Sequence, residues 1–151
     1  MTLGIKLWSL WPLLLTLGGC GAIPEDQSGT MLRVREEGVV RVGLVSGAET
    51  TGKELLDALV DRSAAAAGGR PEVVEGAAEP LLVMLEAGEV DLVVGAFDKS
   101  SPWGSRVHLL PALATEERGG SEIETTAAVR HGENRWIMLL EREARMLTAS
   151  Q

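Results

Sequence analysis

The sequence is poor in cysteine, histidine and aromatic residues. Its 151 residues include one cysteine, two histidines, one phenylalanine and no tyrosine. A single cysteine excludes an intramolecular disulfide and a thiolate metal cluster. Neither His108 nor His131 has a second ligand at metal-binding spacing, and the G-x-S-x-G pattern of a nucleophile elbow does not occur in the sequence. We therefore expect no enzyme, no metal site and no cofactor.

Positive charge is also scarce. The chain has 14 Lys and Arg residues against 22 Asp and Glu residues, a formal net charge of −8. This balance disfavours nucleic acid as a partner and non-specific attraction to anionic lipid. Hydrophobic residues make up 45% of the sequence, which is enough for one globular domain with a core of its own.

The N-terminus has the pattern of a signal peptide. Lys6 precedes an apolar run of 11 residues, Leu7–Leu17, which has the length of a secretory h-region and is shorter than the ~20 residues of a membrane-spanning helix. The following Leu-Gly-Gly-Cys, which ends at Cys20, resembles the lipobox of bacterial lipoproteins. That resemblance implies cleavage after residue 19 and acylation of Cys20, with palmitate among the acyl chains. The alternative is an ordinary secretory signal with a free thiol at Cys20.

A lipoprotein of this kind belongs to the cell envelope, where it is lipid-anchored to a membrane on the extracytoplasmic or periplasmic face. Several acyl chains give stable anchoring where one does not. We divide the chain into a signal peptide (1–19), a tether (20–30) and a single α/β lobe (31–151). The tether assignment rests on the polar and small residues of "AIPEDQSGT", Ala22–Thr30.

From Met31 onwards, hydrophobic periodicity predicts alternating strands and helices. After a helical turn that ends at Gly38, the expected elements are a strand, a helix, a strand, a helix and a strand, at residues 39–45, 51–67, 71–76, 79–88 and 90–97. This order favours a mostly parallel sheet with right-handed crossovers. Two extended runs around Gly119 and Gly120 then predict a β-hairpin.

Three local signals refine this interpretation. Thr51 and Glu54 have the spacing of a capping box at the start of the second helix. Asn134 is the expected N-cap of a last helix that runs to Leu147. Within that helix one side repeats apolar residues and is predicted to face the core, namely Trp136, Leu140, Ala144 and Leu147.

Several segments taken together resemble bacterial family 3 extracytoplasmic solute-binding proteins. "MLRVREEGVVRVGLV", "GKELLDALVDRSA", "PLLVMLEAGEVDLVVGAF" and "LLPALATE" resemble their first lobe, and "AAVRHGENRWIMLLEREARML" resembles the segment that returns from their second lobe. The resemblance implies one lobe of a periplasmic-binding-protein type II fold. It also implies a small polar solute held at the carboxyl ends of the strands, and an ABC importer or a sensor as its destination.

Two departures from that family stand out. Between Glu116 and Thr126 there is room only for a turn, so we expect a hairpin in place of the second lobe. In the family, the loop after the third strand carries a hydroxyl residue and then an arginine that grips a ligand carboxylate. Ser101 matches the hydroxyl position, whereas Trp103 or Gly104 stands at the arginine position. The pocket aromatic expected after the first strand is missing as well.

The candidate ligand residues therefore come from one loop, and they are Asp98, Ser100, Ser101, Trp103 and Arg106. A solvated connection with Trp103 packed on the sheet edge is the competing interpretation of that loop.

Two functions stay open. The first is a small-solute binding or sensing component of an ABC-type or other membrane transporter, with the missing lobe supplied by a partner or by a homodimer. The second is a degenerate lobe that acts as a protein–protein interaction module at the membrane.

Overall fold

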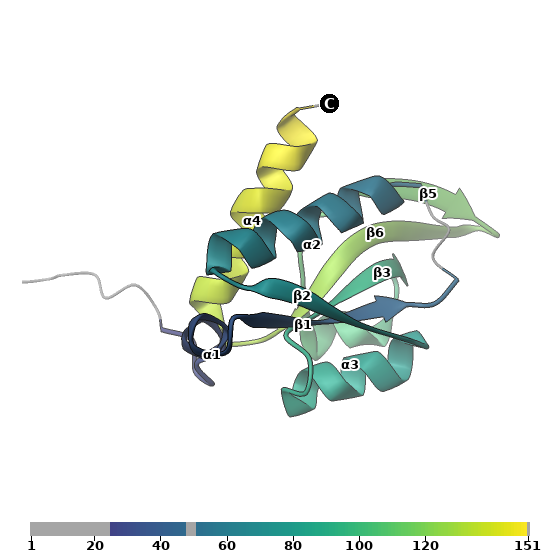
Figure 1. The fold of residues 1–151 in the computed structure, drawn as a ribbon. Coiled ribbons are helices and arrows are strands. Elements are labelled where there is room, and N and C mark those ends of the chain that lie inside the picture. The colour runs from purple at the N-terminus through teal and green to yellow at the C-terminus, as the bar shows by residue number, and fades with distance from the viewer. Residues whose placement is uncertain (1–24, 48–50, 151) are drawn as a thin grey trace, which may run out of the picture.

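The computed structural model describes residues 25–47 and 51–150, so the predicted signal peptide and Cys20 lie outside the described residues. Figure 1 shows the arrangement of the helices and strands. In chain order they are α1 (Thr30–Glu37), β1 (Val39–Val45), α2 (Lys53–Ala67), β2 (Arg70–Gly76), α3 (Ala78–Ala87), β3 (Leu92–Asp98), the 3-10 turn η1 (Pro102–Ser105), β4 (Val107–Leu109), β5 (Ala114–Arg118), β6 (Ser121–Arg130) and α4 (Asn134–Ala149).

The strands form one mixed sheet in the order β2-β1-β3-β6-β4, with β5 paired to β6. β1 pairs in parallel with both β2 and β3, whereas β6 runs antiparallel to β3, β4 and β5. The predicted α/β lobe with a hairpin in the place of a second lobe is therefore confirmed. The antiparallel part arises because β6 turns back at Gly119 and Gly120 and passes along the free edge of β3.

Helices cover both faces of the sheet (Figure 1). Successive residues of β3 point to opposite faces, so Leu92 and Val94 pack with α1, α2 and α4, while Val93 and Phe97 pack with α3. A strand buried on both faces reads as a continuous apolar run. This explains the apolar sequence of β3 and fixes the position of the loop that follows it.

The predicted core stripe of α4 is confirmed. Trp136 and Leu140 are fully buried and Ala144 is 1% exposed. The side-chain Nε1 of Trp136 also has a partner, because it donates to the main-chain oxygen of Asp91 at 2.9 Å. All buried side chains of the two cores lie between residues 30 and 147, so a form of the protein that begins at Gly21 keeps every described core contact.

Neither predicted helix cap is formed as expected. Gly52, with φ +94°, precedes α2, and the hydroxyl of Thr51 donates instead to Glu116 Oε2 at 2.9 Å. At α4, Glu133 is the residue before the helix, and the first amides are bound by Asp26. Both caps were assigned from local spacing, whereas the partners lie far away in sequence.

Residues 25–30, expected to be part of a free tether, are bonded to the lobe. Asp26 Oδ1 accepts from the amides of Arg135 at 2.6 Å and Trp136 at 3.1 Å. The amide of Gln27 donates to the main-chain oxygen of Gly132, and the amide of Thr30 donates to Glu133 at 3.0 Å. Within the described residues the lobe thus includes Asp26 to Thr30, because polar groups of this segment complete the N-terminus of α4. Within the described residues, no helix combines the length and apolar character needed to cross a bilayer.

Candidate functional site

The carboxyl ends of β1, β2 and β3 lie at one edge of the sheet, on the right in Figure 1. In open α/β sheets this edge is where ligands bind, because the loops and helix N-termini there converge. Asp98, the last residue of β3, is paired with Ile123 of β6. The hairpin of β5 and β6 therefore extends this edge, and we call the whole region the strand-end edge.

Two of the predicted ligand residues bind each other. Asp98 Oδ1 accepts from the amide of Ser100 at 2.8 Å and from its hydroxyl at 2.5 Å. These two hydrogen bonds, with a further one from the Ser121 hydroxyl, lower the pKa of Asp98 below its ordinary value. The Asp98 carboxylate is thus held by Ser100 of its own loop and by Ser121 of β6.

The other three predicted residues form a second local group. Ser101 Oγ accepts from the amide of Trp103 at 3.4 Å and caps η1. The guanidinium of Arg106 lies 4.3 Å from the centre of the Trp103 ring and its Nε donates to Glu86 Oε1 of α3 at 3.0 Å. Arg106 is therefore directed to α3, and Trp103 packs against the α3 core. The ligand role of these five residues stays a prediction.

An open hollow lies at the strand-end edge where α2 begins. It has a volume of about 800 Å³ and is lined by residues 51–55 together with Leu113 and Ala114. A Cβ on Gly52 would lie 2.9 Å from the Cβ of Ala114, so glycine is required both by this approach and by its positive φ. Sequence reasoning missed Leu113 and Ala114, because only the hairpin brings them to α2.

Hydrogen bonds tie the start of α2 to the hairpin. Thr125 Oγ1 donates to the main-chain oxygen of Thr51 at 2.8 Å, and Thr51 in turn donates to Glu116. No side chain of the described residues caps α2. An uncapped helix N-terminus presents amide N–H groups and a partial positive charge, which favour a carboxylate.

The hairpin beside the hollow is acidic. Glu116 and Glu117 lie on β5, and Glu122 and Glu124 lie on β6. Lys99 Nζ contacts both oxygens of Glu122, at 2.9 and 3.0 Å, and this hydrogen bond raises the pKa of Lys99. Arg118 pairs with Glu116 and Lys99 also lies 3.8 Å from Glu124, so two exposed cations serve these four carboxylates and the hairpin keeps a net negative charge.

Solved structures similar to this chain are lobes or whole chains of solute-binding proteins. A point mutant of the arginine-bound form of domain 1 from TmArgBP has a TM-score of 0.65 and 17% identity, and the match covers 79% of this chain and 98% of that one. The substrate-binding protein AbpA of an amino acid ABC transporter from Streptococcus pneumoniae, bound to L-arginine, has a TM-score of 0.66 and 9% identity over 79% of this chain and 92% of that one.

A third similar structure is an ancestral amino acid-binding protein, a precursor of cyclohexadienyl dehydratase. Its TM-score is 0.65 at 11% identity, with 80% of this chain and 94% of that chain covered. No protein-family model matches the chain, and no curated protein sequence matches it. At these identities the comparisons establish the fold, which is a periplasmic-binding-protein lobe of the kind represented by domain 1 of TmArgBP.

Proposed function

We propose that this protein is a lipid-anchored lobe on the extracytoplasmic face of a membrane, where it binds a small polar solute for an ABC-type or other membrane transporter. The hollow at the start of α2 is the proposed solute site, and an amino acid with a cationic side chain is the proposed solute class. The observation that carries this proposal is the pairing of an uncapped helix N-terminus with the acidic hairpin.

Two of the three charged groups of such a solute, the α-carboxylate and the side-chain cation, match the two parts of the site. Its α-carboxylate suits the N–H groups of α2, and its side-chain cation suits Glu116, which accepts from Thr51 beside the hollow and would exchange its exposed partner Arg118 for the solute. This arrangement replaces the binding arginine expected from the family resemblance, since Arg106 pairs with Glu86. A bound zwitterion would thus be recognised by this chain without a guanidinium clamp.

Two observations on similar proteins also support the solute proposal. TmArgBP domain 1 and AbpA were both obtained with arginine bound, and the first of these is a single domain. A lobe of this fold can therefore hold an amino acid without its companion, which weakens the need for a second copy or partner at the site. The named similar structures are binding proteins, which favours binding rather than catalysis for this chain.

A second candidate function is a protein–protein interaction module that binds no solute. The loop after β3 favours it, because Asp98 is bonded to Ser100 and Arg106 is stacked on Trp103 and paired with Glu86. In this interpretation the hollow is a surface feature, and the acidic hairpin contacts a basic partner.

A thermal-shift titration of residues 21–151 distinguishes the two. L-arginine, L-lysine, L-glutamine and L-glutamate are added in turn, and the melting temperature is followed to saturation. The solute proposal expects a saturating rise with arginine or lysine. Glu116→Gln should weaken that response roughly tenfold through loss of one charged hydrogen bond, whereas the matched control Glu36→Gln on α1 leaves it unchanged. A flat response to all four solutes supports the interaction module.

Anchoring through Cys20 is tested separately on the full chain. Expressed in a bacterial host with lipoprotein processing, the protein should incorporate labelled palmitate and partition into the membrane fraction. Cys20→Ser should abolish the label. Recovery of the wild-type protein with a free thiol at Cys20 would contradict the lipoprotein assignment and leave the solute proposal untouched.

A further inference from the structure

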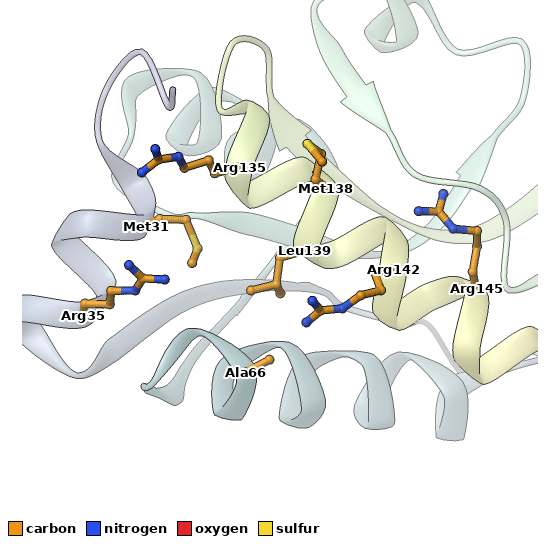
Figure 2. A pocket seen from close by; sticks show the side chains of 8 residues that line it. All are labelled: Met31, Arg35, Ala66, Arg135, Met138, Leu139, Arg142 and Arg145. Atoms are coloured by element: carbon orange, nitrogen blue, oxygen red, sulfur yellow. The ribbon is translucent and has the colours of Figure 1, made fainter. Parts of the chain in front are cut away.

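A second hollow lies far from the strand-end edge, between α1, α2 and α4. Figure 2 shows the arginine and apolar side chains that line it, which come from α1, α2 and α4. It has a volume of about 490 Å³ and is lined by Met31, Arg35, Ala66, Arg135, Met138, Leu139, Arg142 and Arg145. We call this surface the α1/α4 face.

The α1/α4 face concentrates positive charge on an acidic protein. Within the described residues Arg35 has no ion pair, and Arg135 has a single ion pair, with the exposed carboxylate of Glu25 at 3.7 Å. Arg142 pairs with Glu143 at 3.0 Å, but that buried glutamate also serves Arg62. Arg145 pairs with Glu141 at 3.2 Å. Arg35 and Arg135 are therefore the least neutralised of the four arginines and have donors left for phosphate oxygens.

Exposed hydrophobic side chains border the same face. Leu32 on α1 is 63% exposed, and Met138 and Met146 on α4 are 55% and 41% exposed. Leu32 lines a smaller adjoining hollow with Arg35 and Arg135. Large apolar side chains mixed with arginines on one helical surface are typical of helices that lie in the headgroup region of a membrane.

The chain enters the lobe at this face. Asp26 is bonded to the first amides of α4, and Glu25 lies beside Arg135. Residues 21–25 can span at most about 18 Å, at ~3.6 Å for each residue. An acylated Cys20 would therefore hold the α1/α4 face close to the bilayer, whereas the strand-end edge lies on the opposite side of the lobe (Figure 1).

We infer that the α1/α4 face docks on an anionic phospholipid surface, with its arginines on lipid phosphates and Leu32, Met138 and Met146 in the headgroup boundary. The inference deepens the proposed membrane association by assigning an orientation in which the solute site faces away from the bilayer. Residues 21–151 lack Lys6 and carry 13 Lys and Arg against 22 Asp and Glu, a net charge of −9. This charge does not oppose the contact, because charges more than ~8 Å from the lipid are largely screened at physiological salt.

Vesicle sedimentation with residues 21–151, which carry no acyl group, tests the face independently of Cys20. The protein should bind phosphatidylglycerol vesicles and not phosphatidylcholine vesicles, and ~1 M salt should release it. Each arginine is expected to contribute about fivefold in affinity, so Arg35→Gln with Arg142→Gln should weaken binding about 25-fold. Arg70→Gln with Arg118→Gln, two exposed arginines elsewhere, should leave binding unchanged, and circular dichroism checks the fold of each variant.

Several outcomes overturn the inference. Equal binding to the two lipids, or an equal loss in both double variants, shows that the α1/α4 face does not recognise anionic lipid. The protein could fail to bind phosphatidylglycerol and instead self-associate in sedimentation velocity. If Arg35→Gln with Arg142→Gln abolishes that self-association, the face belongs to a contact with a second copy of the protein. None of these results depends on the thermal-shift or palmitate experiments, so failure of the orientation is distinguishable from failure of the proposed function.

Discussion

The indole Nε1 of Trp136 donates a hydrogen bond to the main-chain oxygen of Asp91, 2.9 Å away. The carboxylate of the same Asp91 accepts from the main-chain amide of Arg41 at 2.8 Å and pairs with the guanidinium groups of Arg33 and Arg41. Asp91, which directly precedes β3, therefore connects α4, α1 and β1. This junction sets the position of β3, and with it the loop that leads to the strand-end edge.

Trp136→Phe should lower the free energy of unfolding by about 1–3 kcal/mol. The substitution keeps an aromatic ring but leaves the buried oxygen of Asp91 without this donor, and an unsatisfied buried acceptor costs that amount. Urea denaturation followed by circular dichroism measures the change. Met138→Ala, an exposed substitution on the same helix, is the control and should stay within ~0.5 kcal/mol. Equal effects of the two substitutions would show that the hydrogen bond contributes little.

Asp26→Ala should destabilise the lobe by about 1–2 kcal/mol, in the range measured for helix-capping residues. Asp26 accepts from two amides at the start of α4 and from the amide of Met31 at the start of α1, so its loss exposes both helix ends. Thermal or urea unfolding is the measurement. The neighbouring Glu25 is exposed, and Glu25→Ala is expected to have almost no effect. If Asp26→Ala is also neutral, residues 25–30 behave as the free tether that the sequence suggested.

Because of Glu133, the free energy of unfolding should depend on pH in the acidic range. Burial by itself raises the pKa of Glu133, but hydrogen bonds from Thr30 and Ser28 and the charge of Arg130 outweigh it, and the pKa is lowered below the ordinary value of 4.5. A lowered folded pKa means that the stabilisation is complete above about pH 4.5 and is lost as the pH falls through the folded pKa.

Glu133→Gln tests this dependence. The variant should be less stable than the wild type by about 2 kcal/mol near neutral pH, because charged hydrogen bonds are replaced by neutral ones. The difference should shrink as the pH falls through the lowered pKa of Glu133, because the wild-type carboxyl then becomes protonated. Urea titrations at several pH values measure it, and a difference that stays constant across this range would contradict the assignment.

Gly95→Ala should destabilise the sheet between β1 and β3. A Cβ at Gly95 would lie 2.6 Å from the Cβ of Val45, so the strands must shift, at a cost of about 1–3 kcal/mol. Gly104→Ala is the matched control, because the nearest atom there, Leu109 Cδ1, is 3.9 Å away. Equal melting temperatures for the two variants would show that β1 and β3 are not packed as described.

Much of the fold could be predicted from the sequence, because it depends on local patterns. The continuous apolar run of β3 and the stripe that includes Trp136 and Leu140 on α4 both lie where hydrophobic periodicity placed them. The caps could not be predicted in the same way. Asp26 binds the first amides of α4 although more than a hundred residues separate them in the sequence. The hydroxyl of Thr51 donates to Glu116 of the hairpin and does not cap α2.

The candidate site shows the same division. The sequence placed the loop of Asp98 to Arg106 at the end of β3, where the structure has it. It could not show that Arg106 turns to Glu86 of α3, or that Leu113 and Ala114 form a hollow with the start of α2. These contacts join segments that are far apart in the sequence, so hydrophobic periodicity does not predict them.

The order of strands and helices as far as β3, the hairpin at Gly119 and Gly120, and the burial of Trp136 were determined by the sequence alone, because hydrophobic spacing and turn residues act over a few neighbours. The separation of β4 from β5 was not. Only the tertiary structure decided which polar groups complete each helix end, which side chains line the two hollows, and that four arginines share one face. Those outcomes depend on the packing of distant segments, and packing sets distances that no local pattern specifies.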